Sequence, residues 1–109
     1  MNQSWQTIGA LAQRFDAADA ELGIAPQQSH ILQVLKIGEE FGEAAQAVVG
    51  VMGTNPRKGH SHEWEHVCDE VADVAITAFV ALARMLPNPE TYFEEQLAKK
   101  AAKFLPEEV

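Results

Sequence analysis

The chain carries Lys36-Ile37-Gly38-Glu39-Glu40-Phe41-Gly42-Glu43 and, further on, Asp69-Glu70-Val71-Ala72-Asp73, two acidic segments inside stretches that otherwise have the pattern of buried helix. Residues three apart in an α-helix are neighbours on its surface, so Glu40 and Glu43 point the same way, as do Glu70 and Asp73. Two such pairs on two packed helices would bring four carboxylates together. Because carboxylates repel one another and are costly to desolvate, we expect a divalent cation between them.

Periodic apolar residues predict four helices and no strand, with expected bounds of about 5–20, 26–52, 62–86 and 89–105. Ser4 and Ser61 are the expected N-caps of the first and third helices, while Pro26 and Pro89 suit the first turns of the second and fourth. Short connections favour antiparallel neighbours. The sequence therefore predicts an all-α, four-helix-bundle-like fold in a single domain over residues 1–109.

The second and third helices are expected to be the most buried. The second is apolar on more than one side, which indicates burial from several directions. In the third, Asp73 stands alone in an apolar stretch, where an exposed position would draw its apolar neighbours toward water. We therefore expect Asp73 to be buried and compensated.

Composition limits the classes of partner. A formal net charge of -8 argues against nucleic acid or an anionic membrane surface, since both require clustered Lys and Arg. The longest apolar run is too short to span a membrane, and the first residues lack the pattern of a signal peptide. Cys68, the single cysteine, excludes an internal disulfide and fits a reducing compartment. We expect a cytoplasmic protein.

At 100° per residue, Lys36, Glu40 and Glu43 fall on one stripe of the second helix, and Glu70 and Asp73 on a similar stripe of the third. Carboxylate oxygens with water suit Mg²⁺ or Mn²⁺, and four carboxylates could hold two ions. The alternative is a solvated acidic face, which is the common role of such charge runs. The expected burial of Asp73 weighs against that alternative.

Glu39-Glu40-Phe41-Gly42-Glu43 and Glu70-Val71-Ala72-Asp73 resemble the E-E-x-x-E and E-x-x-D signature of MazG-like, all-α nucleoside triphosphate pyrophosphohydrolases. The likeness covers the second and third helices, roughly half of the chain. It implies hydrolysis of a nucleotide between its α and β phosphates, releasing a monophosphate and pyrophosphate. It also implies that Glu40, Glu43, Glu70 and Asp73 hold Mg²⁺, which Mn²⁺ could replace, and that Glu39 orients or deprotonates the attacking water.

Cations are needed for the remaining phosphate charge. The candidates are one lysine on the acidic stripe, two cations in the loop between the acidic helices and two lysines one turn apart in the last helix: Lys36, Arg57, Lys58, Lys99 and Lys103. Members of the family often carry a late Lys, Asn and Arg set, whereas here the last helix supplies lysines alone. Each lysine also has a structural alternative, as a helix ion pair or beside the negative end of its helix.

Two other readings compete with this one. His62-Glu63-Trp64-Glu65-His66 matches the zinc-peptidase pattern H-E-x-x-H, although it falls at a helix start. A non-catalytic helical interaction module is the second. Gly38 and Gly42 lie one turn apart away from the acids and suit close helix approach, either inside the bundle or across a dimer interface. They fit a dimeric enzyme and a dimeric scaffold equally well. We expect a homo-oligomer, either a dimer or a tetramer.

Overall fold

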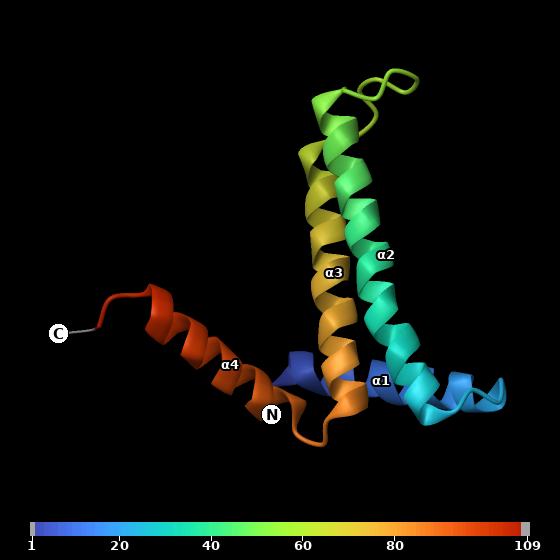
Figure 1. Ribbon diagram of the computed structural model, residues 1–109, viewed down its shortest axis with the longest axis vertical. Helices are drawn as coiled ribbons and strands as arrows, with labels where there is room; N and C mark the ends of the chain where they lie inside the picture. Colours follow the sequence, from blue (N-terminus) through green and yellow to red (C-terminus); the bar gives the residue numbers. More distant parts are fainter. Residues whose placement is uncertain (1, 108–109) are drawn as a thin grey trace.

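The computed structural model describes residues 2–107 and confirms the all-α prediction, since this part of the chain forms four helices and no strand (Figure 1). The helices are α1, Gln3–Glu21; α2, Pro26–Met52; α3, Trp64–Met85; and α4, Pro89–Phe104. Pro26 and Pro89 occupy first turns as predicted. Proline suits these places because its missing N–H would have no partner inside the helix.

Both predicted serine caps were wrong. Asn2 caps α1, its Oδ1 atom accepting a hydrogen bond from the backbone N–H of Trp5 at 3.0 Å, so that Ser4 lies inside the helix. Ser61 instead belongs to the loop, where its N–H donates to the carbonyl oxygen of Gly50 at 3.0 Å. This bond ties the loop to the end of α2, and α3 begins only after Glu63.

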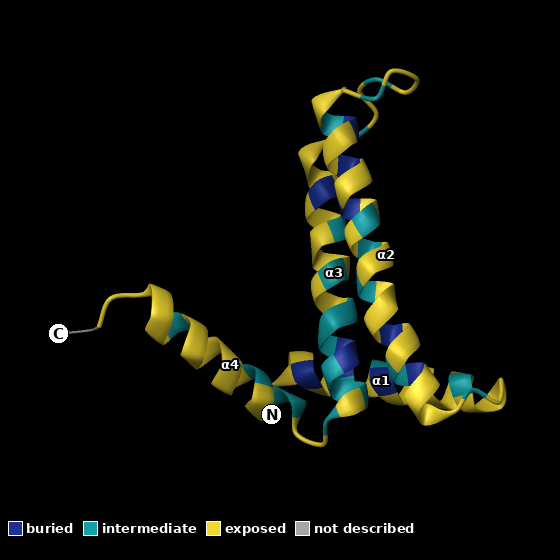
Figure 2. Ribbon diagram, in the orientation of Figure 1, coloured by how far each residue is buried: buried dark blue, intermediate teal, exposed yellow. Residues whose placement is uncertain are grey.

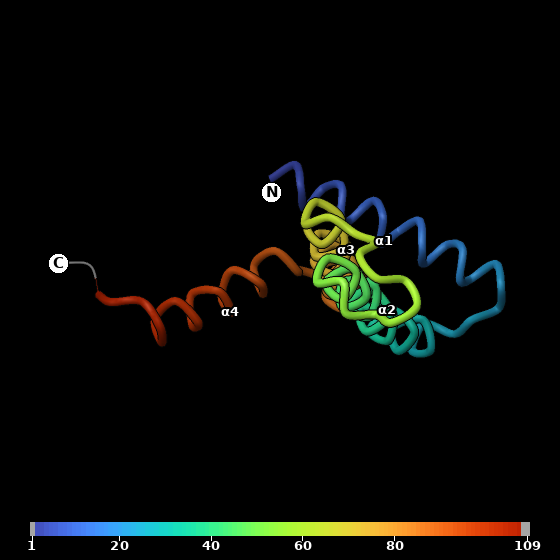
Figure 3. The backbone as a smooth tube through the Cα atoms, turned by 90° about the horizontal axis from the view of Figure 1, so that it is seen from above, coloured from blue at the N-terminus to red at the C-terminus, as the bar shows by residue number. Residues whose placement is uncertain are grey.

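The helices α2 and α3 form a long antiparallel hairpin, and α1 crosses it at the end where α2 begins and α3 finishes (Figures 1 and 3). Small buried residues on α2, including Ala44, Ala47 and Gly50, allow the two long helices to approach closely. The core lies at the crossing of α1 and α3, where it consists of Trp5, Ile8, Ala12 and Val80.

An aromatic cluster joins this core to α4. The ring of Phe79 lies 5.1 Å from that of Trp5 and 4.9 Å from that of Phe93, in edge-to-face arrangements. Beyond Phe93, α4 points away from the hairpin and has no buried residue (Figures 1 and 2). The four helices therefore do not close into one bundle within this chain.

The expectation that α2 is buried from several directions was wrong. One face packs on α3, but large apolar side chains on other faces are exposed, among them Leu35 at 63% and Phe41 at 65% (Figure 2). The radius of gyration is 17.3 Å, whereas a compact chain of this length has about 13 Å. The apolar residues of α2 do lie on several faces, but within residues 2–107 only the face toward α3 is well covered.

Candidate metal centre

Three of the four predicted metal ligands meet midway along the hairpin. Glu40 and Glu43 from α2 and Glu70 from α3 each offer a carboxylate oxygen, and these oxygens lie within 4.8 Å of one another. The spacing of three residues puts both α2 acids on the side toward α3, and the antiparallel packing brings Glu70 opposite them. No other group of three potential ligands occurs so close together in residues 2–107.

The cluster is partly withdrawn from water. The Oε2 atom of Glu70 is shielded from solvent and has no hydrogen-bond partner, and the side chain of Glu40 is only 14% exposed. Lys36 approaches from one side, its Nζ atom 3.8 Å from Oε1 of Glu40. A shielded carboxylate oxygen without a partner is costly, so this arrangement favours uptake of a cation or a proton.

Desolvation raises the pKa of Glu70, and the neighbouring carboxylate of Glu43 raises it further. The pKa of Glu40 is raised by the same two causes in the same order, while Lys36 acts in the opposite direction. Both carboxyls therefore hold a proton more tightly than an exposed glutamate does. A bound cation would remove the repulsion that causes part of this shift.

Asp73 is exposed, so its predicted burial was wrong. Its negative charge is among the causes that raise the pKa values of Glu40 and Glu70. Asp73 does not, however, belong to the cluster of close carboxylate oxygens, which consists of Glu40, Glu43 and Glu70. The apolar neighbours Val71 and Ile76 are 54% and 45% exposed, because none of the helices in residues 2–107 covers that face of α3. Asp73 thus lies at the edge of the cluster, accessible to solvent.

The remaining predicted site residues are spread over the molecule. Glu39 is exposed, and its carboxylate lies 3.4 Å from Nζ of Lys36. Arg57 and Lys58 lie in the loop at the far end of the hairpin, where both backbone N–H groups donate to Oδ1 of Asn55. Of the predicted phosphate-binding cations, Lys36 is therefore the one that the chain itself places beside the acids.

The other two predicted phosphate-binding lysines lie on α4, which extends away from the hairpin (Figure 1). Lys103 rests with Nζ 5.5 Å from the ring centre of Phe104. Lys99 is exposed on the same helix. Neither residue is brought to the acidic cluster within this chain, so their part in substrate binding stays a prediction.

The two histidines of the H-E-x-x-H pattern are close, with ring centres 5.7 Å apart, but His62 precedes α3 instead of lying within it. Nδ1 of His66 accepts the backbone N–H of Glu63 at 2.9 Å, and Nδ1 of His62 is 2.9 Å from the hydroxyl of Ser61. The Nδ1 atom of each histidine thus interacts with a neighbouring residue of the chain. Within the described residues these histidines have no third potential ligand close enough to complete a metal site.

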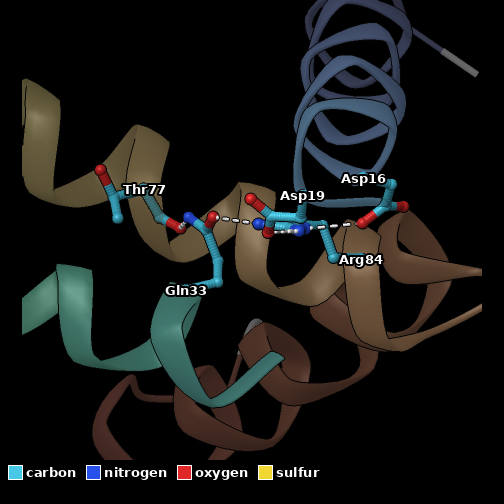
Figure 4. A network of polar contacts seen from close by, with 5 residues as sticks. All are labelled: Asp16, Asp19, Gln33, Thr77 and Arg84. Atoms are coloured by element: carbon cyan, nitrogen blue, oxygen red, sulfur yellow. Dashed lines mark hydrogen bonds and ion pairs between the residues drawn. The ribbon is translucent and has the colours of Figure 1, made fainter. Parts of the chain in front are cut away.

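A polar network that the sequence analysis missed ties α1, α2 and α3 together (Figure 4). Arg84, whose side chain is 4% exposed, donates from Nε to Asp16 at 2.8 Å and from Nη2 to Asp19 at 2.7 Å. Its Nη1 donates to Oε1 of Gln33, whose Nε2 in turn donates to the carbonyl oxygen of Thr77. A hydrogen bond from Arg84 is the largest of the effects that lower the pKa of Asp19.

A signal for this network was present in the sequence. Arg84 ends an almost continuously apolar stretch, and a buried guanidinium needs carboxylate partners. Asp16 and Asp19, three residues apart on α1, present such partners on one helix face. Sequence alone does not show that α1 crosses the end of α3, which is what brings them together.

A cavity of about 410 Å³ lies between the Arg84 network and the acidic cluster. Its walls are mainly apolar and include the side chains of Phe15, Leu32 and Ile76. Lys36 and Glu40 also line it, so the cavity and the acidic cluster share Glu40. A ligand with an apolar or aromatic part and a charged part could therefore occupy the cavity and reach the acids.

Comparison of the chain with models of protein families, with characterised proteins and with solved structures found no match. Within residues 2–107, no helix has both the length and the apolar character required to cross a lipid bilayer.

Proposed function

We propose that the protein is a Mg²⁺-dependent nucleoside triphosphate pyrophosphohydrolase of the MazG-like type. It would cleave a ribo- or deoxyribonucleoside triphosphate between the α and β phosphates, giving the monophosphate and pyrophosphate. One observation carries the proposal: Glu40, Glu43 and Glu70 converge, with an oxygen of Glu70 shielded and without a partner. The single free thiol of Cys68 supports a reducing, cytoplasmic setting.

In this proposal Glu40, Glu43 and Glu70 hold the metal from the hairpin, and Asp73 adds a ligand from the exposed edge. Mg²⁺ would neutralise phosphate charge and lower the pKa of the attacking water. Glu39, exposed beside Lys36, would orient or deprotonate that water. Lys36, which faces both Glu39 and Glu40, would stabilise phosphate charge at the mouth of the cavity.

The cavity beside the cluster supports a nucleotide as substrate. Its volume of about 410 Å³ is within the roughly 300–1,000 Å³ of small-molecule sites. Phe15, whose side chain is 39% exposed, offers an aromatic surface on the cavity wall. Glu40 lines the same cavity and belongs to the acidic cluster, so the cavity adjoins the cluster. A base could occupy the apolar part while the phosphates approach the cluster. Phosphate contacts by Arg57, Lys58, Lys99 and Lys103 remain part of the proposal.

The test is release of pyrophosphate from a panel of nucleoside triphosphates with Mg²⁺ or Mn²⁺. Glu43→Ala and Asp73→Ala should each lower kcat/KM by more than about 100-fold, beyond the loss typical of residues that only support metal ligands. Glu94→Ala, at an exposed position on α4, is the matched control and should retain activity. Full activity in both of the first two variants would refute the site assignment.

A non-catalytic interaction module is the second candidate, because α2 and α4 expose large apolar side chains such as Leu35 and Leu97. Such a module would associate with a partner without hydrolysing any nucleotide. If no member of the nucleotide panel yields pyrophosphate while the protein still self-associates, the module is the better description.

A further inference from the structure

The end of the cavity away from the acidic cluster carries two shielded polar side chains. Gln33 is 8% exposed and the side chain of Arg84 is 4% exposed, and both residues line the cavity of about 410 Å³. We call this part of the cavity its inner end. A shielded polar group without a partner is costly, so a ligand that fills the cavity must satisfy the hydrogen-bonding capacity that these two side chains have left.

The orientation of the Gln33 amide is fixed by its two partners (Figure 4). Arg84 can only donate, so the atom that lies 2.8 Å from its Nη1 must be the amide oxygen, Oε1. The backbone oxygen of Thr77 can only accept, so the atom that lies 3.2 Å from it must be Nε2. This hydrogen bond uses one N–H of Nε2 and leaves the other. The amide cannot turn over without breaking both hydrogen bonds.

Donors outnumber acceptors among these shielded groups. Two carboxylates and the amide oxygen of Gln33 accept from Arg84, which engages three of its five N–H groups within the described part of the chain. Two N–H groups of Arg84 and one of Gln33 are left for solvent or a ligand. Asp19 also lines the cavity, but its side chain is 23% exposed, so water can reach its remaining lone pairs. The inner end therefore calls for a ligand that accepts hydrogen bonds.

A neutral acceptor suits these donors better than an anion does. Asp16 and Asp19 oppose the single positive charge of Arg84, so the network is negative overall and would repel a phosphate or carboxylate group. The carbonyl oxygen of a planar heterocycle carries no net charge and can accept two hydrogen bonds. The ring of such a ligand fits the mainly apolar walls, where Phe15 offers an aromatic surface for stacking.

The cavity follows the hairpin from its inner end toward the acidic cluster. The contact between Gln33 and Thr77 is one layer of the hairpin. Glu40 lies seven residues further along α2, and Glu70 lies seven residues back along α3, so these two acids form a second layer. Seven residues correspond to about 10 Å of helix. A nucleoside whose base reaches Gln33 would extend toward Glu40, which lines the same cavity.

We propose that the inner end of the cavity binds the carbonyl edge of an oxo-substituted base, and that Gln33, donating together with Arg84, is the residue that determines this specificity. Uracil, thymine, guanine and hypoxanthine present a ring carbonyl where cytosine and adenine present an amino group. An amino group at this point would set donor against donor and leave the shielded N–H groups unpaired. The inference rests on the proposed function, because it takes the ligand to be a nucleotide, and it adds the class of base.

Nucleosides test this inference without metal or phosphate. Inosine and adenosine are matched in size and carry a carbonyl and an amino group, respectively, at the same ring carbon, as do uridine and cytidine. NMR titrations of the wild type with a chelator present should give tighter binding of inosine than of adenosine, and of uridine than of cytidine, each by about tenfold or more. Equal affinities within both pairs, tighter binding of the amino-bearing members, or no binding of any nucleoside would overturn the inference.

Gln33→Met separates recognition of the base from support of the fold, because methionine keeps the length of the side chain and removes its polar atoms. The variant should weaken inosine binding about tenfold and leave adenosine binding within about twofold, so that most of the preference is lost. A residue that only supports the fold would weaken both nucleosides alike, and that result would refute the specificity role. The wild-type titrations decide the inference if this variant does not fold.

Gln27→Met is the matched control, since it is the same substitution at an exposed position of α2, and it should bind both nucleosides as the wild type does. Pyrophosphate release distinguishes this inference from the proposed function. A carbonyl preference in nucleoside binding, without hydrolysis of any triphosphate, would keep the base site and reject the hydrolase. Hydrolysis of inosine and adenosine triphosphates with equal kcat/KM, and no preference in nucleoside binding, would keep the hydrolase and reject the inference.

Discussion

At the scale of single residues, Glu70 is the member of the acidic cluster whose ionised form is most clearly destabilised by the fold. Its Oε2 atom is shielded and has no partner, and both desolvation and Glu43 raise its pKa. A carboxyl whose pKa is higher in the folded than in the unfolded protein favours folding in its protonated form. This contribution is fully present below the pKa of the unfolded chain and is lost as the pH rises through the folded pKa.

We therefore predict that the metal-free protein becomes more stable as the pH falls from neutral into the mildly acidic range. Glu70→Gln, an uncharged substitution of similar shape, should raise the melting temperature at neutral pH and flatten this pH dependence. Melting curves in the presence of a chelator would measure both effects. Glu94→Gln, on the exposed surface of α4, is the control and should reproduce the wild-type profile.

Asp19 limits this trend at lower pH, because its pKa is lowered, mainly by the hydrogen bond from Arg84. Its contribution to stability is present above the pKa of the unfolded chain and is lost as the pH falls through the lower, folded value. The raised pKa of Glu70 favours folding at lower pH, whereas the lowered pKa of Asp19 favours folding at higher pH. Together they place the maximum of stability at mildly acidic pH. A melting temperature that falls steadily from neutral pH downward in the metal-free protein would contradict the assigned shifts.

At the scale of elements, Arg84 holds three helices together. It is the centre of the network that links Asp16 and Asp19 of α1 with Gln33 of α2 (Figure 4). Its two carboxylate partners are 53% and 23% exposed, so they can be hydrated when the guanidinium is lost. Hydration of these carboxylates offsets most of the loss of their hydrogen bonds, so the remaining cost is about that of one hydrogen bond to a charged group, roughly 1.5–3 kcal/mol.

We predict that Arg84→Met, which keeps an apolar stem, lowers the free energy of unfolding by about 2–3 kcal/mol. Urea denaturation followed by circular dichroism would measure the loss. Arg14→Met is the matched control on α1, where the side chain is exposed, and should change stability by less than about 0.5 kcal/mol. An equally small effect of Arg84→Met would show that α1 is held by its apolar contacts alone.

At the scale of the whole molecule, the chain is extended because α4 leaves the hairpin and is anchored mainly through Phe93. We predict that the protein, measured at a concentration at which sedimentation velocity shows a monomer, gives a radius of gyration near 17 Å in small-angle X-ray scattering, as the 17.3 Å of the Cα atoms indicates. A value near the roughly 13 Å of a compact chain would mean that α4 folds back onto the hairpin.

Local signals account for what the sequence predicted well. Pro26, Pro89 and the run of apolar residues fixed four helices, and spacing within a turn put Glu40 and Glu43 on one face. These features depend on neighbours within about four positions along the chain. Ser4 and Ser61 were wrong as caps because Asn2 and Glu63, close to them in the sequence, occupy the N-cap positions. The burial of Asp73 was wrong because it depends on which elements cover its helix, and that is not a local property.

By itself, then, the sequence determined the helical class, the helix bounds to within a few residues and the acidic segments, because backbone propensity and side-chain periodicity are properties of short stretches. The tertiary structure alone decided that Glu40, Glu43 and Glu70 meet while Asp73 stays exposed, that Arg84 joins three helices, and that large apolar side chains of α2 stay exposed. These features depend on how helices far apart in the chain pack against one another, and no local pattern encodes which face of a helix remains without a partner.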